Sequence, residues 1–137
     1  MSDVPPPKPR ERGFFLHVVP ALLYVFAIFY TGVIRLPHVR GPTNFDKVMH
    51  AGAFGLMQLV VLRAVAFEVA KIPPRRQNLI AFVLVVAAGG VLEVVQSFTP
   101  YRSAELLDWV ADAIGAGIVA LVVERLRSGR TDQPSAG

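Results

Sequence analysis

The sequence predicts an all-α protein: a bundle of four transmembrane helices with antiparallel neighbours and both termini in the cytoplasm. Two observations support this. Of the 137 residues, 53% are hydrophobic and only 18% are charged, a balance that is unusual for a soluble domain. The apolar residues also form four runs, each as long as the roughly 20 residues that a helix needs to cross about 30 Å of hydrocarbon. The predicted spans are about 14–34, 48–70, 78–98 and 105–126.

The first span follows a basic, proline-rich segment. Residues 1–12 contain VPPPKP and have no means of burying apolar surface, so we expect a disordered tail. The span at 14–34 is longer than the core of a usual signal peptide. It is followed by Arg-Leu-Pro and not by a small-residue cleavage site, so an uncleaved helix is expected.

Short loops separate the four spans. Proline or glycine marks each of them, at 37–42, 73–74 and 100, where a helix is expected to stop. Because the loops are short, consecutive helices should be antiparallel neighbours in one domain, residues 13–127. Residues 128–137 (SGRTDQPSAG) are expected to form a second disordered tail.

Basic residues predict the orientation, because cytoplasmic loops carry an excess of Lys and Arg. Nine of the 14 Lys and Arg residues lie on the side of the termini and the second loop, four lie on the other side, and Arg63 lies within a span. This distribution places both termini inside. The net charge of +4 therefore reflects membrane orientation, and we expect no nucleic-acid partner. The chain has no cysteine, which excludes disulfides, thiolate metal sites and cysteine nucleophiles.

With this topology, three segments bring polar side chains to the extracytoplasmic side: the start of the second span, the end of the third and the start of the fourth. The inner halves of the third and fourth spans are almost purely aliphatic. We therefore predict one polar, hydrated pocket at the outer edge. Its expected members are Asp46, Lys47, His50, Glu93, Gln96, Arg102, Glu105, Asp108 and Asp112.

Asp46 and His50 are four residues apart, so they share one face of a helix. In a functional interpretation, the carboxylate orients the imidazole as a general base or shares a metal ion with it. In a structural interpretation, Asp46 stabilises the positive end of the helix dipole and His50 lies at the membrane interface. The sequence leaves both interpretations open.

The remaining acidic residues lie in or next to the third and fourth spans. An ionised carboxylate costs about 2.5–3.5 kcal/mol at the centre of a membrane helix and less near its end. Glu93 should therefore face the bundle interior. Glu105, Asp108 and Asp112 repel one another on one helix face, so Arg102, Lys47, a bound cation or a retained proton must offset the repulsion.

Two segments, DKVMHAGAFGLMQL (46–59) and EVVQSFTPYRSAELLDWVADAIGAGIVA (93–120), resemble the VanZ-like family of small bacterial integral membrane proteins. The family pattern is Asp-Lys-x-x-His, then Glu-x-x-Gln, an Arg, and an Asp followed by Asn and Gly. Asp112 stands where Asn is common, and Glu105 where Asp is frequent. The residues that fit the pattern are Asp46, Lys47, His50, Glu93, Gln96, Arg102, Asp108 and Gly115.

The resemblance implies a four-helix, multi-pass protein of the bacterial inner membrane. Through the founding member, it also implies a link to resistance against teicoplanin-type glycopeptide antibiotics. We expect an envelope protein that is not an enzyme, needs no cofactor, and binds a lipid headgroup, a lipid-linked cell-wall precursor or a lipoglycopeptide. The sequence leaves a homo-oligomer open. The expected ligand-binding residues are Lys47, Gln96, Arg102, Asp108 and Asp112.

Two alternatives remain. The first is an intramembrane hydrolase or transferase that acts on lipid phosphates with a divalent metal such as Mg²⁺, Mn²⁺, Ca²⁺ or Zn²⁺. Its catalytic candidates are His50, Asp46 and Glu93, and its metal candidates are Asp46, His50, Glu93, Asp108 and Asp112. The second is a small oligomeric transporter, which is disfavoured because the acidic residues stop at one membrane edge.

Overall fold

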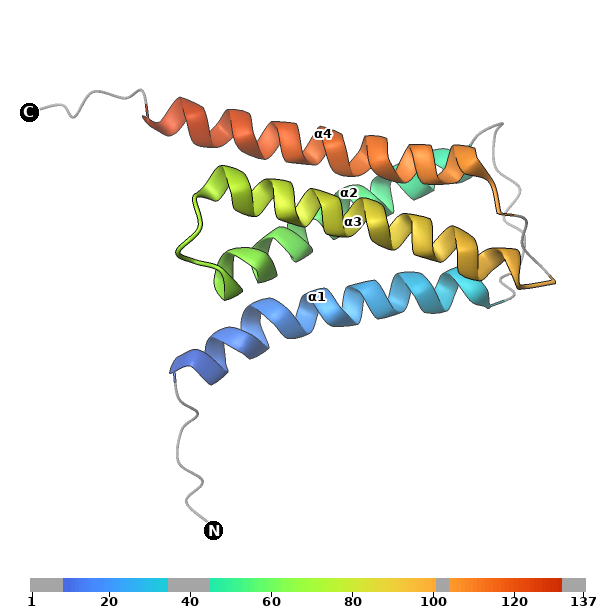
Figure 1. Ribbon diagram of the computed structural model, residues 1–137, viewed down its shortest axis with the longest axis horizontal. Helices are drawn as coiled ribbons and strands as arrows, with labels where there is room; N and C mark the ends of the chain where they lie inside the picture. Colours follow the sequence, from blue (N-terminus) through green and yellow to red (C-terminus); the bar gives the residue numbers. More distant parts are fainter. Residues whose placement is uncertain (1–8, 35–44, 101–103, 132–137) are drawn as a thin grey trace, which may run out of the picture.

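The computed structural model describes residues 9–34, 45–100 and 104–131. Within these ranges the chain is helical and contains no strand. The four helices are α1 (Pro9–Val33), α2 (Phe45–Glu68), α3 (Pro74–Ser97) and α4 (Leu106–Thr131) (Figure 1). Helices of 24 to 26 residues are about 36–39 Å long at 1.5 Å per residue, and all four are apolar enough to cross a membrane. The predicted all-α class with four spans is confirmed.

The helix ends differ from the predicted spans. α1 begins at Pro9, so residues 9–12, expected in the disordered tail, are helical. Proline is favourable in a first helical turn, where its missing N–H removes no hydrogen bond, and Glu11 in that turn favours the helix dipole. α4 likewise continues to Thr131, into the expected C-terminal tail. The rest of both tails lies outside the described residues.

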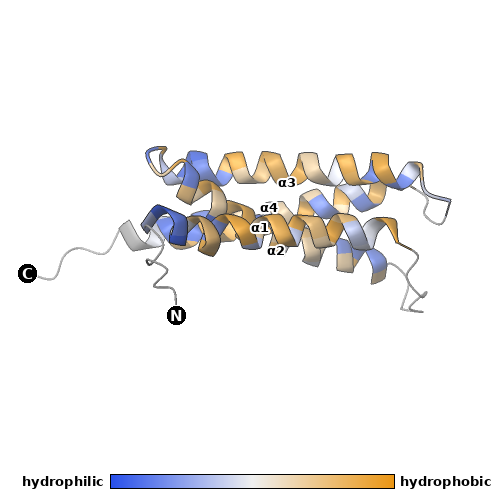
Figure 2. Cartoon of the chain, turned by 90° about the horizontal axis from the view of Figure 1, so that it is seen from below, coloured by the Kyte–Doolittle hydropathy of each residue, from blue (hydrophilic) through white to orange (hydrophobic). Residues whose placement is uncertain are grey.

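The surface of the bundle is apolar over the middle of every helix. Large side chains such as Phe26 and Leu121 are 68% and 67% exposed. Figure 2 shows hydrophobic residues along the central part of the helices and hydrophilic ones gathered toward their ends. Such a surface is unfavourable in water and favourable in hydrocarbon. Together with the four spans, it indicates a multi-pass membrane protein.

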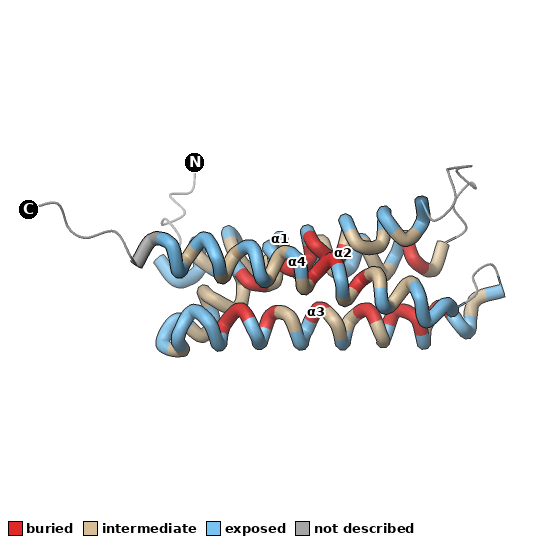
Figure 3. Tube along the Cα trace, turned by 90° about the horizontal axis from the view of Figure 1, so that it is seen from above, coloured by how far each residue is buried: buried red, intermediate tan, exposed pale blue. Residues whose placement is uncertain are grey.

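The interior is small, and its buried residues lie on the sides that the helices turn toward one another (Figure 3). Its centre is Phe54, Met57, Val85, Leu92 and Ala116. Polar groups also join the helices here. Gln58 is fully buried and donates to Asn78 Oδ1 at 3.2 Å, while Asn78 donates to the carbonyl of Ala120 at 2.9 Å. These hydrogen bonds link α2, α3 and α4 inside the bundle.

α2 and α4 make the closest backbone approach. A Cβ added to Gly115 would lie only 2.0 Å from the carbonyl oxygen of Ala51, and a Cβ added to Gly55 would lie 3.3 Å from the carbonyl oxygen of Gly115. Glycine is needed at such a contact because any side chain would push the backbones apart. The approach sets how near the polar side chains of the two helices come to each other.

Candidate functional site

A group of charged side chains from α2, α3 and α4 meets at one end of the bundle. The ends involved are the start of α2, the C-terminal part of α3 and the beginning of α4. We call this group the polar cluster, and it consists of Asp46, Lys47, His50, Glu93, Glu105, Asp108 and Asp112.

The outer part of the polar cluster is centred on Lys47. Its Nζ lies 3.3 Å from Asp46 Oδ2 and 3.2 Å from both Glu105 Oε2 and Asp108 Oδ1. The Asp46 and Glu105 side chains are largely exposed, whereas Asp108 is only 14% exposed. Lys47, one of the four alternatives named for this role, thus offsets the repulsion between Glu105 and Asp108. Its three N–H groups are already directed at three carboxylates, which leaves little capacity for an anionic ligand.

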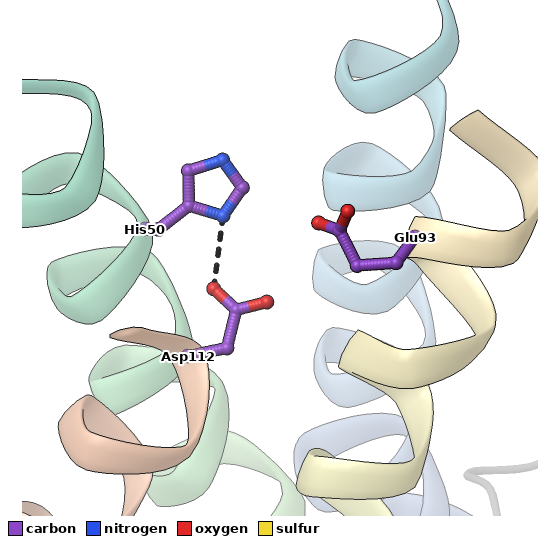
Figure 4. Close-up of side chains that lie close together, drawn as sticks. All are labelled: His50, Glu93 and Asp112. Carbon is purple, nitrogen blue, oxygen red and sulfur yellow. Dashed lines mark hydrogen bonds and ion pairs between the residues drawn. The ribbon is translucent and has the colours of Figure 1, made fainter. Parts of the chain in front are cut away.

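The inner part consists of His50, Glu93 and Asp112, which come from three different helices and point toward one another (Figure 4). His50 Nδ1 lies 2.9 Å from Asp112 Oδ1, and the Asp112 side chain is completely buried. Glu93 Oε2 accepts a hydrogen bond of 2.9 Å from the backbone N–H of Glu105. As predicted, Glu93 faces the bundle interior.

Asp108 connects the two parts. While its Oδ1 accepts from Lys47, its Oδ2 lies 3.8 Å from His50 Nε2. The polar cluster is therefore one continuous set of charges that runs from exposed residues to buried ones.

Of the two interpretations of Asp46 and His50, the structure does not show the one in which the two side chains pair. His50 pairs with Asp112 on α4, and Asp46 pairs with Lys47. The reason is the close approach of α2 and α4 at Gly115, which brings the first turns of α4 beside the face of α2 that carries His50. Asp46 lies one turn earlier, and its side chain is 59% exposed.

Two other predicted members are not among the residues of the polar cluster. Gln96 is buried, but its Nε2 donates to the carbonyl of Gly32 at 3.1 Å and so ties α3 to α1. Arg102 lies outside the described residues. The expectation that both bind a ligand therefore remains a prediction, and for Gln96 the observed role is helix packing.

Two contacts of the site had not been predicted. The carboxylate of Glu93 holds the backbone N–H of Glu105 at the start of α4. Trp109 donates from Nε1 to the carbonyl of Val86 on α3 at 2.9 Å. Each contact depends on how α3 and α4 pack, so the sequence pattern contains no signal for it.

Two open grooves of about 440 and 510 Å³ lie elsewhere on the bundle. They are lined by residues such as Arg10 and Lys71 in one case and Arg63 and Arg127 in the other. Neither groove includes a residue of the polar cluster, so a ligand of the cluster would meet it at the bundle edge and not in these grooves.

In comparisons with protein-family models, curated proteins and solved structures, nothing matches this chain. The resemblance to the VanZ-like family therefore rests on the residues of the two segments quoted above.

Proposed function

We propose that this chain is a VanZ-like protein of the bacterial inner membrane that binds a polar headgroup at its extracytoplasmic edge. In this arrangement consecutive helices cross the membrane in opposite directions, and both termini are cytoplasmic. The observation that carries the proposal is the gathering of seven ionisable side chains, six from three helices and Glu105 just before α4, at one end of a bundle whose middle is apolar on its surface. Ionisable residues in membrane helices are expensive and commonly mark a functional site.

The charges of the polar cluster favour a headgroup that carries an ammonium group. The described cluster contains five carboxylates and one ammonium, and Lys47 is already engaged. The exposed carboxylates of Asp46 and Glu105 would contact the amine, while Arg102 would hold the phosphate through paired hydrogen bonds. A phosphatidylethanolamine-like lipid and an amine-bearing lipid-linked cell-wall precursor share this chemistry. Binding of such a headgroup by the protein would also alter susceptibility to teicoplanin-type antibiotics. The family resemblance suggests this effect.

The proposed orientation predicts a labelling pattern. Because the chain has no cysteine, a single introduced cysteine is the only reactive thiol. In intact cells, a membrane-impermeant maleimide should label Ala104→Cys, beside the polar cluster, and should not label Gly129→Cys near the end of α4. Both should react after the membrane is permeabilised. The opposite pattern would place the polar cluster in the cytoplasm and contradict the proposal.

Headgroup binding predicts a loss of affinity when Arg102 is removed. Hydrogen bonds to charged groups contribute about 1.5–3 kcal/mol, so Arg102→Ala should weaken binding of phosphatidylethanolamine by about tenfold or more. The matched control is Arg75→Ala, an 89% exposed arginine at the other end of α3, which should bind as the unchanged protein does. Native mass spectrometry of the detergent-solubilised protein measures the bound lipid.

Two comparisons make this test decisive. Phosphatidylglycerol, which has the phosphate but no amine, should bind more weakly than phosphatidylethanolamine, and an amine-bearing precursor should compete with the latter. Cells that produce Arg102→Ala should also lose any change in teicoplanin susceptibility that the unchanged protein causes. Equal lipid binding by Arg102→Ala and Arg75→Ala would overturn the proposed headgroup site.

A further inference from the structure

The buried part of the polar cluster has the features of a metal site. His50, Glu93 and Asp112 each offer one ligand atom, and these three atoms lie within 4.8 Å of one another. They come from α2, α3 and α4, and Figure 4 shows the three side chains directed at a common point between the helices. A site made by three helices is rigid, because the packing of the helices fixes its ligands.

Two carboxylate oxygens at this point have no hydrogen-bond partner. Asp112 Oδ2 and Glu93 Oε1 are both buried and unpaired. The Asp112 side chain is 0% exposed, and Glu93 is 9% exposed. In Figure 4, Asp112 Oδ2 lies on the side that faces Glu93. An unpaired carboxylate oxygen is costly away from water, and a cation bound between Glu93 and Asp112 would supply the missing partner of both.

The described cations of the polar cluster do not supply this partner. Lys47 Nζ is directed at Asp46, Glu105 and Asp108, all within 3.3 Å. Even with a protonated His50, the described part of the cluster sets five carboxylates against two cations, which leaves an excess of three negative charges. A divalent cation between Glu93 and Asp112 would offset most of this excess, and it would do so where the unpaired oxygens lie.

The donor set also indicates the kind of ion. One imidazole with two carboxylates suits Zn²⁺ or Mn²⁺ better than Ca²⁺ or Mg²⁺, which prefer oxygen ligands throughout. Tetrahedral ligands about 2.0–2.2 Å from a zinc ion lie about 3.3–3.6 Å apart, and the three ligand atoms here lie within 4.8 Å of one another before any ion draws them together.

The surroundings place a polar group beside His50 and another beside Glu93, as is usual around metal ligands. A metal-bound histidine usually donates its other ring N–H to a carboxylate, which orients the ring. Here Asp108 Oδ2 lies 3.8 Å from His50 Nε2, on the side of the ring opposite the Nδ1 that faces Asp112. The backbone N–H of Glu105 similarly orients Glu93 through its second oxygen.

We propose that His50, Glu93 and Asp112 bind one divalent transition-metal ion, Zn²⁺ or Mn²⁺, inside the bundle, and that Asp108 orients His50. The ion joins three helices just below the proposed headgroup site, so it holds the polar cluster in place. This site does not depend on headgroup binding, because none of its three ligands is the arginine assigned to the headgroup.

The test is the metal content of the detergent-purified protein, measured by inductively coupled plasma mass spectrometry after loading with Zn²⁺ or Mn²⁺ and removal of free ion. We expect about one ion per chain in the unchanged protein and almost none in Asp112→Asn. The matched control is Asp46→Asn, which removes the same charge from the exposed part of the polar cluster and should retain the ion. Loss of the ion from Asp46→Asn with retention in Asp112→Asn would overturn the proposed location.

A second measurement keeps the test valid if Asp112→Asn does not fold. Added Zn²⁺ or Mn²⁺ should raise the Tm of the unchanged protein, and a chelator should reverse the rise, because an ion that binds only the folded state stabilises it. No bound ion together with no change in Tm would overturn the proposal. Arg102→Ala should keep its metal content, so a failed headgroup site and a failed metal site give different results.

Discussion

Gly115→Ala is expected to lower the free energy of unfolding by about 3 kcal/mol, the upper end of the cost of overpacking a core. The added Cβ would lie 2.0 Å from the carbonyl oxygen of Ala51 and 2.6 Å from its carbonyl carbon. Both atoms belong to a helix backbone, which cannot rotate away as a flexible side chain can. α2 and α4 must therefore separate, and the His50–Asp112 contact should weaken with them.

The measurement is unfolding of the protein in mixed micelles by increasing SDS, followed by circular dichroism. Gly52→Ala is the matched control. Gly52 follows Ala51 on the same helix, and a Cβ added to it would meet nothing within 4 Å. This control should be neutral or slightly stabilising, since alanine has the better helix propensity. If the two variants unfold at the same SDS concentration, α2 and α4 do not approach as closely as described.

Lys47→Met is expected to destabilise the bundle strongly at neutral pH. Its ammonium lies within 3.3 Å of three carboxylates, and its removal leaves them to repel one another beside Glu93 and Asp112. Methionine keeps the length and apolar stem of the side chain, so the effect should come from the lost charge. The Tm of the purified protein in detergent measures the change.

The rescue variant for this prediction is Lys47→Met with Asp108→Asn. Removing the least exposed of the three carboxylates should restore most of the lost Tm, because residues in direct contact show non-additive effects. The matched control is Lys71→Met, which removes a lysine from the turn between α2 and α3, at the other end of the bundle, and should change the Tm little. Equal loss of Tm in Lys47→Met and Lys71→Met would show that Lys47 does not neutralise the polar cluster.

The four helices could be predicted from the chain because each depends on a local property, a run of apolar residues interrupted by proline or glycine. The helix ends were less predictable. Residues 9–12 are polar, so hydropathy excludes them, although Pro9 is well suited to begin a helix and Glu11 to its first turn. The same limit applies to the end of α4, where polar residues continue the helix to Thr131.

The gathering of Asp46, His50, Glu93, Asp108 and Asp112 at one end also follows from local information, because alternating spans return each polar segment to the same side. Which residues these side chains pair with does not follow from local information. Spacing within one helix allowed Asp46 as a partner of His50, whereas the structure pairs His50 with Asp112, 62 positions away. Gln96 shares a face with Glu93 in sequence, yet it donates to Gly32 on α1.

Hydropathy and charge along the chain were thus sufficient to predict the number of helices and the end of the bundle at which the ionisable groups collect. Both depend on each segment's own preference for hydrocarbon or water. Which carboxylate meets which cation was set by helix packing. The missing side chain at Gly115 lets α4 approach α2 until Asp112 reaches His50, while Glu93 is held against the start of α4. Interactions between ionisable groups change steeply over a few ångströms, so this packing determines the chemistry of the site.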